Sequence, residues 1–252
     1  MDRGLYVAMT GAKQIMQAQA LNNHNIANAS TVGFRADAVS FTSEPIYGPG
    51  FATRVNAVAG DAGTDFSSGV MMSTSRPLDV AVNGKGFIAV RGADGKEAYT
   101  RAGDLQVTAS GAVITATGFP VLSESGPLTV PPSTQVTIGT DGTVSVVPLG
   151  LSAAAQSQVD RIKLVNPKLS DLQKGADGLL RLKSGANGQA GAKAKTDETV
   201  TLASGALESS NVNAAQSLVN MIELQRLYEL QIKSINSTDQ NEQSAERLMA
   251  AA

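Results

Sequence analysis

Apolar residues near the N-terminus recur with the spacing of an amphipathic helix. At 100° per residue they fall on one face of that helix. The stripe consists of Leu5, Ala8, Met9, Ala12, Ile15, Met16 and Ile26. It predicts a helix over about residues 3–28, which should end before Gly33, because glycine readily adopts the left-handed conformation that closes helices.

The C-terminal stretch carries a second and stronger helical pattern. All nine prolines lie between Pro45 and Pro167, and the last glycine is Gly205, so no breaker follows. Asn211 or Asn213 can cap the first turn. Steps of three and four residues, typical of a coiled-coil seam, join Leu218, Met221, Gln225, Tyr228, Ile232 and Ile235, with Ile222 and Leu224 beside them. This seam predicts one partner helix.

Three further apolar residues lie on the opposite side of the same predicted helix. Val219, Leu227 and Leu230 are mixed there with charged residues, so a single partner helix would leave them in water. They predict a second contact surface. The alternative is that they are ordinary exposed apolar residues, which are common on protein surfaces.

The middle of the chain has the pattern of short strands separated by turns. Asn83-Gly84 and Asp94-Gly95 supply the positive φ that hairpin turns need. Strands are expected at residues 78–82, 87–90, 98–100, 105–108, 112–116, 136–138, 143–147, 161–165 and 179–182. Residues 42–75, with two prolines and several Gly, Ser and Thr residues, are expected to form an extended connector containing short pairings.

Together these elements predict an α+β fold. Long N- and C-terminal helices pack as a coiled-coil-like pair, and an extended connector leads to a central all-β domain. The expected segments are 1–35 for the N-terminal helix of an inner assembly domain, 36–76 for the connector, 77–205 for the β-rich domain, and 206–252 for the C-terminal helix of the inner domain.

The composition argues against several classes of function. A formal charge of -2 gives no basic field to attract phosphates, so nucleic-acid binding is not expected. With no cysteine and a single histidine, the chain cannot build disulfides or the usual nitrogen and sulfur metal sites, and it has no cofactor motif. No apolar run approaches the roughly 20 residues that cross a bilayer, and no Sec signal is readable. Membrane insertion is therefore not expected.

The candidates for catalytic chemistry have simpler structural interpretations. His24 has no obvious partner in the sequence to orient it, so a polar contact at a helix end is its expected role. Asp94, Asp104 and Asp141 each stand beside a glycine, as turn residues do. Two alternatives remain open: a secreted β-rich carbohydrate-active enzyme that uses Asp79 or Asp104, and a secreted adhesin with helical anchors.

Three blocks of residues resemble the signatures of bacterial flagellar rod and hook proteins. The N-terminal block contains Asn25, Ala27, Asn28, Thr31, Gly33, Phe34 and Arg35. The central block contains Pro77, Leu78, Asp79, Gly84, Gly86, Phe87, Tyr99, Thr100 and Arg101. The C-terminal block contains Ser210, Asn211, Val212, Asn213, Arg226 and Tyr228. Residues 1–11, 161–165 and 174–179 most resemble the proximal-rod members, and the distal-rod members are the close alternative.

The resemblance implies a structural subunit of the flagellar basal-body rod, with no enzymatic activity, metal or cofactor. Such a subunit polymerises with other rod subunits and copies of itself into the axial shaft that transmits torque from motor to hook. The resemblance also implies export by the flagellar type III apparatus without a cleaved signal peptide, and a rod that crosses the periplasm. Subunit contacts are expected at Leu5, Met9, Ala12, Ile15, Met16, Ile26, Leu218, Val219, Met221, Ile222, Gln225, Leu227, Tyr228, Leu230, Ile232 and Ile235.

Overall fold

The chain divides into two compact units, each assembled from separate stretches of sequence. The computed structural model describes residues 4–45, 55–148, 150, 156–183 and 193–250. Unit 1 consists of Met1–Ala29, Ala36–Asp65 and Val212–Ala252, and unit 2 consists of Ser30–Arg35 and Phe66–Asn211. Both ends of the chain therefore belong to unit 1, although unit 2 lies between them in the sequence.

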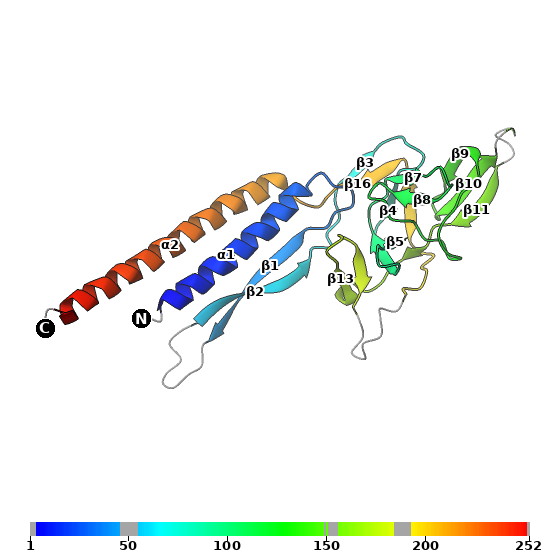
Figure 1. The fold of residues 1–252 in the computed structure, drawn as a ribbon. Helices are drawn as coiled ribbons and strands as arrows, with labels where there is room; N and C mark the ends of the chain where they lie inside the picture. The colour runs from blue at the N-terminus through cyan, green and yellow to red at the C-terminus, as the bar shows by residue number, and fades with distance from the viewer. Residues whose placement is uncertain (1–3, 46–54, 149, 151–155, 184–192, 251–252) are drawn as a thin grey trace. The chain divides into compact units, whose positions relative to one another are not determined.

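Unit 1 contains two long helices and one hairpin. Helix α1 spans Gly4–Ala27 and helix α2 spans Ala214–Ala250, while strands β1 (Asp37–Pro45) and β2 (Val55–Thr64) pair antiparallel. Figure 1 shows α1 and α2 side by side in opposite directions, with the hairpin on the other side of α1. Both helices occupy stretches where the periodicity predicted them, and the Asn213 side chain accepts a hydrogen bond from the Gln216 backbone N–H as an N-cap does.

The buried face of α1 consists mostly of small residues, whereas the covered face of α2 includes larger apolar ones. On α1 the buried positions are Ala8, Ala12, Ile15, Ala18 and Asn22. On α2 the covered positions are Ser217, Met221, Leu224, Tyr228, Gln231, Ile235, Thr238 and Glu242. A coiled coil needs large apolar side chains along both seams, so the predicted coiled-coil-like pair is wrong. The helices pack together, but three of the six expected seam positions of α2, namely Leu218, Gln225 and Ile232, stay exposed.

The predicted extended connector is also wrong. Within residues 36–76, β1 and β2 form a long two-stranded ladder from Asp37↔Thr64 to Pro45↔Val55, and residues 46–54 lie outside the described part. The hairpin also contacts α1. The prolines, glycines and small polar residues of this segment are typical of connectors, and neither strand carries a strongly apolar face. The sequence therefore shows no sign that the segment forms a long hairpin.

Unit 2 consists of short antiparallel strands in several small sheets. A five-stranded sheet has the order β12-β5-β6-β14-β13, a three-stranded sheet has the order β11-β10-β9, and the pairs β15-β4, β16-β3 and β7-β8 stand as two-stranded sheets. The bounds are β3 Met71–Ser73, β4 Val80–Asn83, β5 Phe87–Arg91, β6 Glu97–Thr100, β7 Leu105–Val107, β8 Val113–Thr115, β9 Ser133–Ile138, β10 Thr143–Pro148, β11 Ser157–Arg161, β12 Leu164–Val165, η2 (a 3-10 turn) Leu169–Asp171, β13 Leu172–Lys174, β14 Leu180–Leu182, β15 Thr201–Ser204 and β16 Ala206–Glu208.

Two apolar clusters form the interior of unit 2, and strand β5 contributes to both. Its residues Ile88 and Val90 join the larger cluster, while Phe87 and Ala89 join the smaller one, because successive side chains of a strand point to opposite faces. The predicted central all-β domain is nevertheless wrong. The strands are only two to six residues long, and they are distributed over several sheets. The structure therefore shows mostly small separate sheets in place of one all-β domain.

Candidate functional site

Large apolar side chains are exposed along both helices of unit 1. On α1 they are Tyr6, Met9, Met16 and Leu21, and on α2 they are Leu218, Val219, Ile222, Leu227, Leu230, Ile232, Leu248 and Met249. Met16 is 56% exposed and Leu230 is 58% exposed. Among the other residues expected to make subunit contacts, Ala12 and Ile15 are buried, Leu5, Ile26, Met221, Tyr228 and Ile235 are half-buried, and Gln225 is exposed.

The exposed apolar residues of α2 fall on two flanks of the face that α1 covers. At 100° per residue, Leu218, Ile222 and Ile232 lie to one side of that face, and Val219, Leu227 and Leu230 lie to the other. We call these the Ile222 flank and the Leu230 flank. α1 already occupies the covered face, so each flank is free to contact a further chain.

Two grooves run beside the helices of unit 1. A hollow of about 330 Å³ is lined by α1, α2 and β1, and the apolar side chains of Leu21, Phe41 and Leu227 are exposed around it. A second hollow of about 380 Å³ is lined by Val7 and Gly11 of α1, by β2 and by α2. The Leu230 flank is thus continuous with the first of these grooves, since Leu227 belongs to both.

Asparagine side chains near the end of α1 fix it to its neighbours within unit 1. Buried Asn22 donates from Nδ2 to the Ser217 carbonyl of α2 at 2.8 Å. Asn25 forms two bonds with the Asp37 backbone, donating to its carbonyl at 2.8 Å and accepting from its N–H at 2.9 Å. His24 Nδ1 lies 3.1 Å from Asp37 Oδ2. The signature residue Asn25 therefore anchors the first residue of β1 to the helix.

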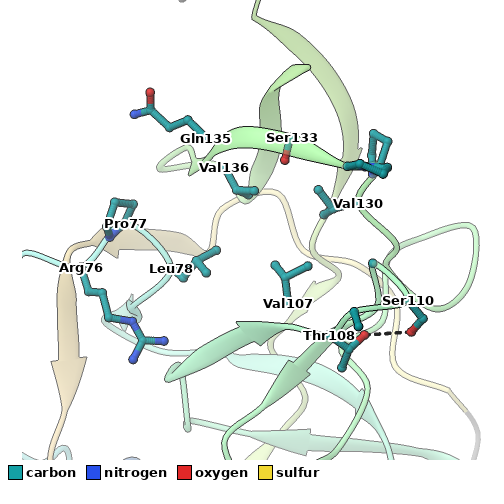
Figure 2. Close-up of a pocket in the computed structure, with 14 residues that line it drawn as sticks. Arg76, Pro77, Leu78, Val107, Thr108, Ser110, Val130, Ser133, Gln135 and Val136 are labelled. Carbon is teal, nitrogen blue, oxygen red and sulfur yellow. Dashed lines mark hydrogen bonds between the residues drawn. The ribbon is translucent and has the colours of Figure 1, made fainter. Parts of the chain in front are cut away.

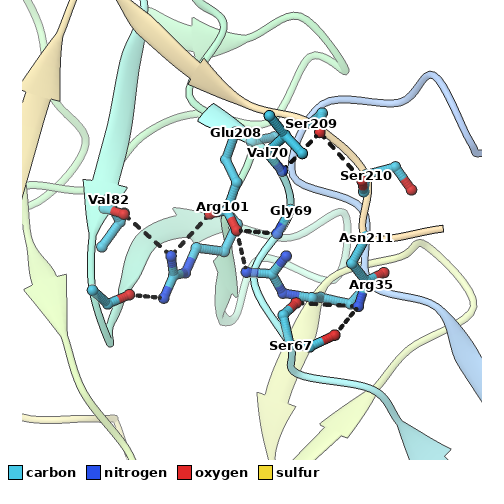
Figure 3. A network of polar contacts seen from close by, with 12 residues as sticks. Arg35, Ser67, Gly69, Val70, Val82, Arg101, Glu208, Ser209, Ser210 and Asn211 are labelled. Atoms are coloured by element: carbon cyan, nitrogen blue, oxygen red, sulfur yellow. Dashed lines mark hydrogen bonds and ion pairs between the residues drawn. The ribbon is translucent and has the colours of Figure 1, made fainter. Parts of the chain in front are cut away.

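Unit 2 brings Arg35 of the N-terminal block and Arg101 of the central block together around one buried carboxylate, that of Glu208, two residues before the C-terminal block (Figure 3). Arg35 Nη2 donates to Glu208 Oε1 at 2.7 Å, and Arg101 Nη1 donates to Glu208 Oε2 at 2.9 Å. The side chains of Arg35, Arg101 and Glu208 are only 3%, 6% and 1% exposed. The backbone N–H of Gly69 donates to Glu208 Oε1 at 2.9 Å, so one carboxylate joins four segments of the chain.

The backbone packs tightly around this cluster, which we call the Glu208 cluster. Gly33 has a φ of +67°, and a Cβ there would overlap the backbone of Arg101 and Ala102. A Cβ on Gly69 would overlap the Ser209 carbonyl. Only glycine fits either position, because the close approach leaves no room for a side chain. The signature glycine at position 33 is thus explained by packing against the segment that contains Arg101.

Two guanidinium groups share the single carboxylate of Glu208. Burial lowers the pKa of Arg101 from its usual value, Glu208 opposes that effect, and Arg35 adds to it. The Arg101 guanidinium also donates to the carbonyls of Val82 and Gly84 and lies 5.3 Å from the Phe87 ring centroid. These contacts account for Gly84, Phe87 and Arg101 of the central block.

Sequence reasoning missed Glu208 and Gly69. Glu208 lies two residues before the C-terminal block, and its neighbour Leu207 is apolar, so it has the pattern of an ordinary outward-facing strand residue. Arg35 and Arg101 gave one signal for a buried carboxylate. Both arginines belong to the signature blocks, and an arginine that is buried needs a carboxylate partner. The sequence contains many acidic residues, and nothing local selects the one 173 residues away from Arg35.

Three other signature residues form hydrogen bonds within their own unit. In unit 2, the Asn211 side chain donates from Nδ2 to the carbonyl and to the hydroxyl of Ser67. The Asn211 backbone N–H donates to the Phe34 carbonyl at 3.3 Å. The Thr100 hydroxyl accepts from the N–H of Ala102. In unit 1, Asn28 donates to the His24 carbonyl.

The acidic candidates mostly make turn contacts. Asp94 accepts from the N–H of Lys96, and Asp141 accepts from the N–H and hydroxyl of Thr143, so the pKa of each is held below its usual value. Asp79 and Asp104 are paired in an isolated antiparallel bridge, and burial raises the pKa of Asp104.

A hollow of about 550 Å³ is lined in part by residues 76–78, just before Asp79, and by residues 107–111, shortly after Asp104 (Figure 2). Leu78, Val107 and Val130 surround it, and neither Asp79 nor Asp104 is among the residues that line it. Pro77 and Leu78 of the central block thus form a mainly apolar wall. In the described part of the chain, no three His, Asp or Glu side chains gather as metal ligands would, and neither helix is long and apolar enough to span a bilayer.

Comparison with known proteins places the chain in a family. The family model described as "Flagellar hook protein FlgE/F/G D1 domain" matches residues 81–146, and "Flagellar basal body rod FlgEFG protein C-terminal" matches residues 203–248. The flagellar basal-body rod protein FlgF of Salmonella typhimurium is 40% identical over 99% of both chains, and that of Escherichia coli K12 is 41% identical over 99% of both. FlgG of Buchnera aphidicola is 33% identical over 97% of this chain and 98% of its own. The chain therefore belongs to the family of flagellar basal-body rod proteins, and its role is that of a structural subunit of the rod.

Proposed function

We propose that this rod subunit joins its neighbours through the exposed apolar flanks of α1 and α2. The observation that carries the proposal is the division of the exposed apolar residues of α2 into the Ile222 flank and the Leu230 flank, on either side of the face covered by α1. Removing such side chains from water stabilises an assembly by about 25 cal/mol per Å² of apolar surface. The neighbours are copies of this chain and other rod or hook components.

The geometry of two flanks favours an extended assembly. Contacts between unlike surfaces propagate from subunit to subunit and form a helix when the rotation does not close a ring. α2 has 37 residues, so the helix is about 55 Å long at 1.5 Å per residue. A helix of that length with an apolar surface on each flank can contact several neighbours along an axial tube. Torque then passes from subunit to subunit by packing contacts, with no chemical step in this chain.

We place the subunit in the proximal rod. The 40% and 41% identities with FlgF of Salmonella typhimurium and Escherichia coli over nearly the whole chain support this position. The distal position is the alternative, and the 33% identity with FlgG of Buchnera aphidicola fits it. The proposal includes a rod that crosses the periplasm and export by the flagellar type III apparatus without a cleaved signal peptide. The termini would be unfolded during passage through a narrow export channel and would become ordered only on assembly. Each subunit contact then carries the entropic cost of that ordering.

The experiment that tests the proposed contacts places charge on one flank. The double variant Leu227→Asp, Leu230→Asp should keep its helix content, because both side chains are exposed, and should no longer restore rods or motility in a strain that lacks the subunit. Circular dichroism and isolation of basal bodies measure the two effects. Glu198→Gln, at an exposed position of unit 2 away from both flanks, is the control and should assemble normally. Normal rods from the double variant would contradict the proposal.

A further inference from the structure

Strand β3 of unit 2 is an edge strand with apolar side chains in water. It pairs with β16 alone, because these two strands form a two-stranded sheet. Three consecutive large apolar residues lie on β3 or directly before it: Val70 is 71% exposed, Met71 45% and Met72 47%. Native proteins usually protect exposed edge strands with charged side chains or proline. β3 carries neither.

The register of the β3–β16 ladder shows which backbone groups of β3 face away from β16. The Val70 carbonyl accepts from the residue that follows β16 at 2.9 Å, and the Thr74 N–H donates to the residue that precedes β16 at 2.8 Å. In an antiparallel pair, such hydrogen-bonded residues alternate with residues whose N–H and C=O groups point outward. Met72 therefore bonds to β16, whereas the N–H and C=O groups of Met71 and Ser73 point away from it and bond to no described residue.

The Glu208 cluster holds this edge in place. Met71 lies opposite Glu208 in the ladder. Just before β3, the Gly69 N–H donates to the Glu208 carboxylate at 2.9 Å, and the Val70 N–H donates to the Ser209 hydroxyl at 3.0 Å (Figure 3). A segment that is already fixed in an extended conformation loses little conformational entropy when another strand pairs with it. β3 is therefore preorganised for strand pairing.

The backbone groups of β3 select an extended partner. The outward N–H and C=O groups of Met71 and Ser73 alternate along the strand, and an added strand offers the complementary alternation. A helix bonds its own backbone groups internally and would leave those of β3 unpaired. Successive side chains of a strand point to opposite faces, so Val70 and Met72 share one face and Met71 lies on the other. Apolar side chains of an added strand would pack against both faces.

Another edge strand of unit 2 has the opposite chemistry. β11 is the outer strand of the three-stranded sheet, and its residues Ser157, Gln158, Asp160 and Arg161 are polar or charged. Charged residues on an edge oppose pairing with a further strand. The combination of an outward-facing ladder and large apolar side chains therefore distinguishes β3 from β11.

We propose that β3 accepts an extended apolar segment of a neighbouring rod subunit, which adds to the β16–β3 sheet as a further strand. That the partner is a rod subunit rests on the proposed function. The added strand bonds to the outward groups of Met71 and Ser73 and covers the side chains of Val70, Met71 and Met72. Unit 2 thereby makes a subunit contact through different residues from those of the α2 flanks.

Proline substitution tests this contact at single backbone groups. Met71→Pro removes an N–H that β16 does not use, so the free chain should keep its circular dichroism and its urea midpoint. In a strain that lacks the subunit, this variant should lose the ability to restore rods and motility. Met71→Ala keeps the N–H and is the matched control, which should restore both. Ser73→Pro removes the second outward N–H and should behave as Met71→Pro does.

Hydrogen exchange measures the same groups in the unmodified chain and decides the question even if the proline variants do not fold. The amide hydrogens of Met71 and Ser73 should exchange about tenfold more slowly in isolated basal bodies than in the free chain, as a gained backbone hydrogen bond requires. Equal exchange rates would overturn the proposal, and so would normal rods from the folded proline variants.

Two further outcomes would also overturn the proposal. Loss of rods in Met71→Ala as well would show that the side chain, and not the backbone edge, makes the contact. Dimers of the free chain that Met71→Pro abolishes would show that the edge closes a pair of identical chains. The flank variant Leu227→Asp, Leu230→Asp does not alter β3, so each of these outcomes leaves the proposed function standing.

Discussion

At the residue scale, the Glu208 cluster shows how charged residues become part of a protein interior. Two arginines and one glutamate are buried together, and backbone carbonyls and an aromatic ring share the remaining contacts. Such a cluster is worth little compared with an apolar core of equal size, but losing one member leaves an uncompensated charge behind. The main effect of the cluster is therefore on specificity: it favours the one arrangement in which the segments containing Arg35, Gly69, Arg101 and Glu208 meet.

The first prediction concerns the carboxylate of Glu208. Glu208→Gln keeps the size of the side chain but leaves two buried guanidinium groups without a counter-charge. We expect the free energy of unfolding to fall by about 3–5 kcal/mol, measured by urea denaturation. Glu124→Gln, an exposed glutamate of the same unit, should change it by less than about 0.5 kcal/mol. A small effect of Glu208→Gln would show that the cluster is not needed for stability.

The second prediction concerns Asp104 and pH. Burial raises its pKa above 3.8, and the negative charge of Asp79 adds to the effect. Between 3.8 and the raised value, the folded chain holds a proton that the unfolded chain has released, so this contribution to stability is present at low pH and lost as pH rises through that window.

Asp104→Asn cannot ionise and removes that dependence. The free energy of unfolding of the variant, relative to the unmodified chain, should therefore increase from about pH 4 to about pH 7. The matched control is Asp94→Asn, because the pKa of Asp94 is lowered and its contribution has the opposite sign. A difference that stays flat with pH for Asp104→Asn would contradict the assignment.

At the element scale, the helices could be predicted and the hairpin could not. A stripe of period 3.6 and the absence of proline and glycine after Gly205 are local signals, and α1 and α2 follow them closely. Only half of the predicted seam of α2 is covered: Leu218, Gln225 and Ile232 stay exposed. The sequence shows which residues of α2 are apolar, but it does not show which face of α2 will pack against the small residues of α1. β1 and β2 are stabilised by pairing with each other and by contact with α1, and neither contact has a local signature.

The third prediction tests the contact between the helices. Asn22→Ala removes the hydrogen bond to the Ser217 carbonyl, which keeps its own helical bond within α2, and should destabilise the helix pair by about 1 kcal/mol. Amide hydrogen exchange should become faster in the first turns of α2. The exposed neighbour Asn23 provides the control, and Asn23→Ala should leave exchange unchanged. Equal exchange in both variants would show that Asn22 does not hold the helices together.

At the scale of the whole molecule, the two units have different kinds of surface. Unit 1 exposes apolar side chains along two long helices, while unit 2 buries most of its apolar residues in two clusters and exposes a smaller number, among them Val70, Met72 and Leu169. The three signature blocks identified the family from the sequence, because they are long and specific. The convergence of Arg35, Arg101 and Glu208 could not be predicted, since it depends on contacts between residues more than 100 positions apart.

The central claim is that both flanks of α2 contact neighbouring subunits in the assembled rod. A photoreactive amino acid placed at Ile222 or at Leu230, one on each flank, tests it directly in isolated basal bodies. Both positions should cross-link to other rod or hook subunits, whereas the exposed position Glu198 should give no cross-link to α2 of a neighbour. If neither flank, or only one, yields cross-linked subunits, α2 does not join its neighbours on two sides and the account is contradicted.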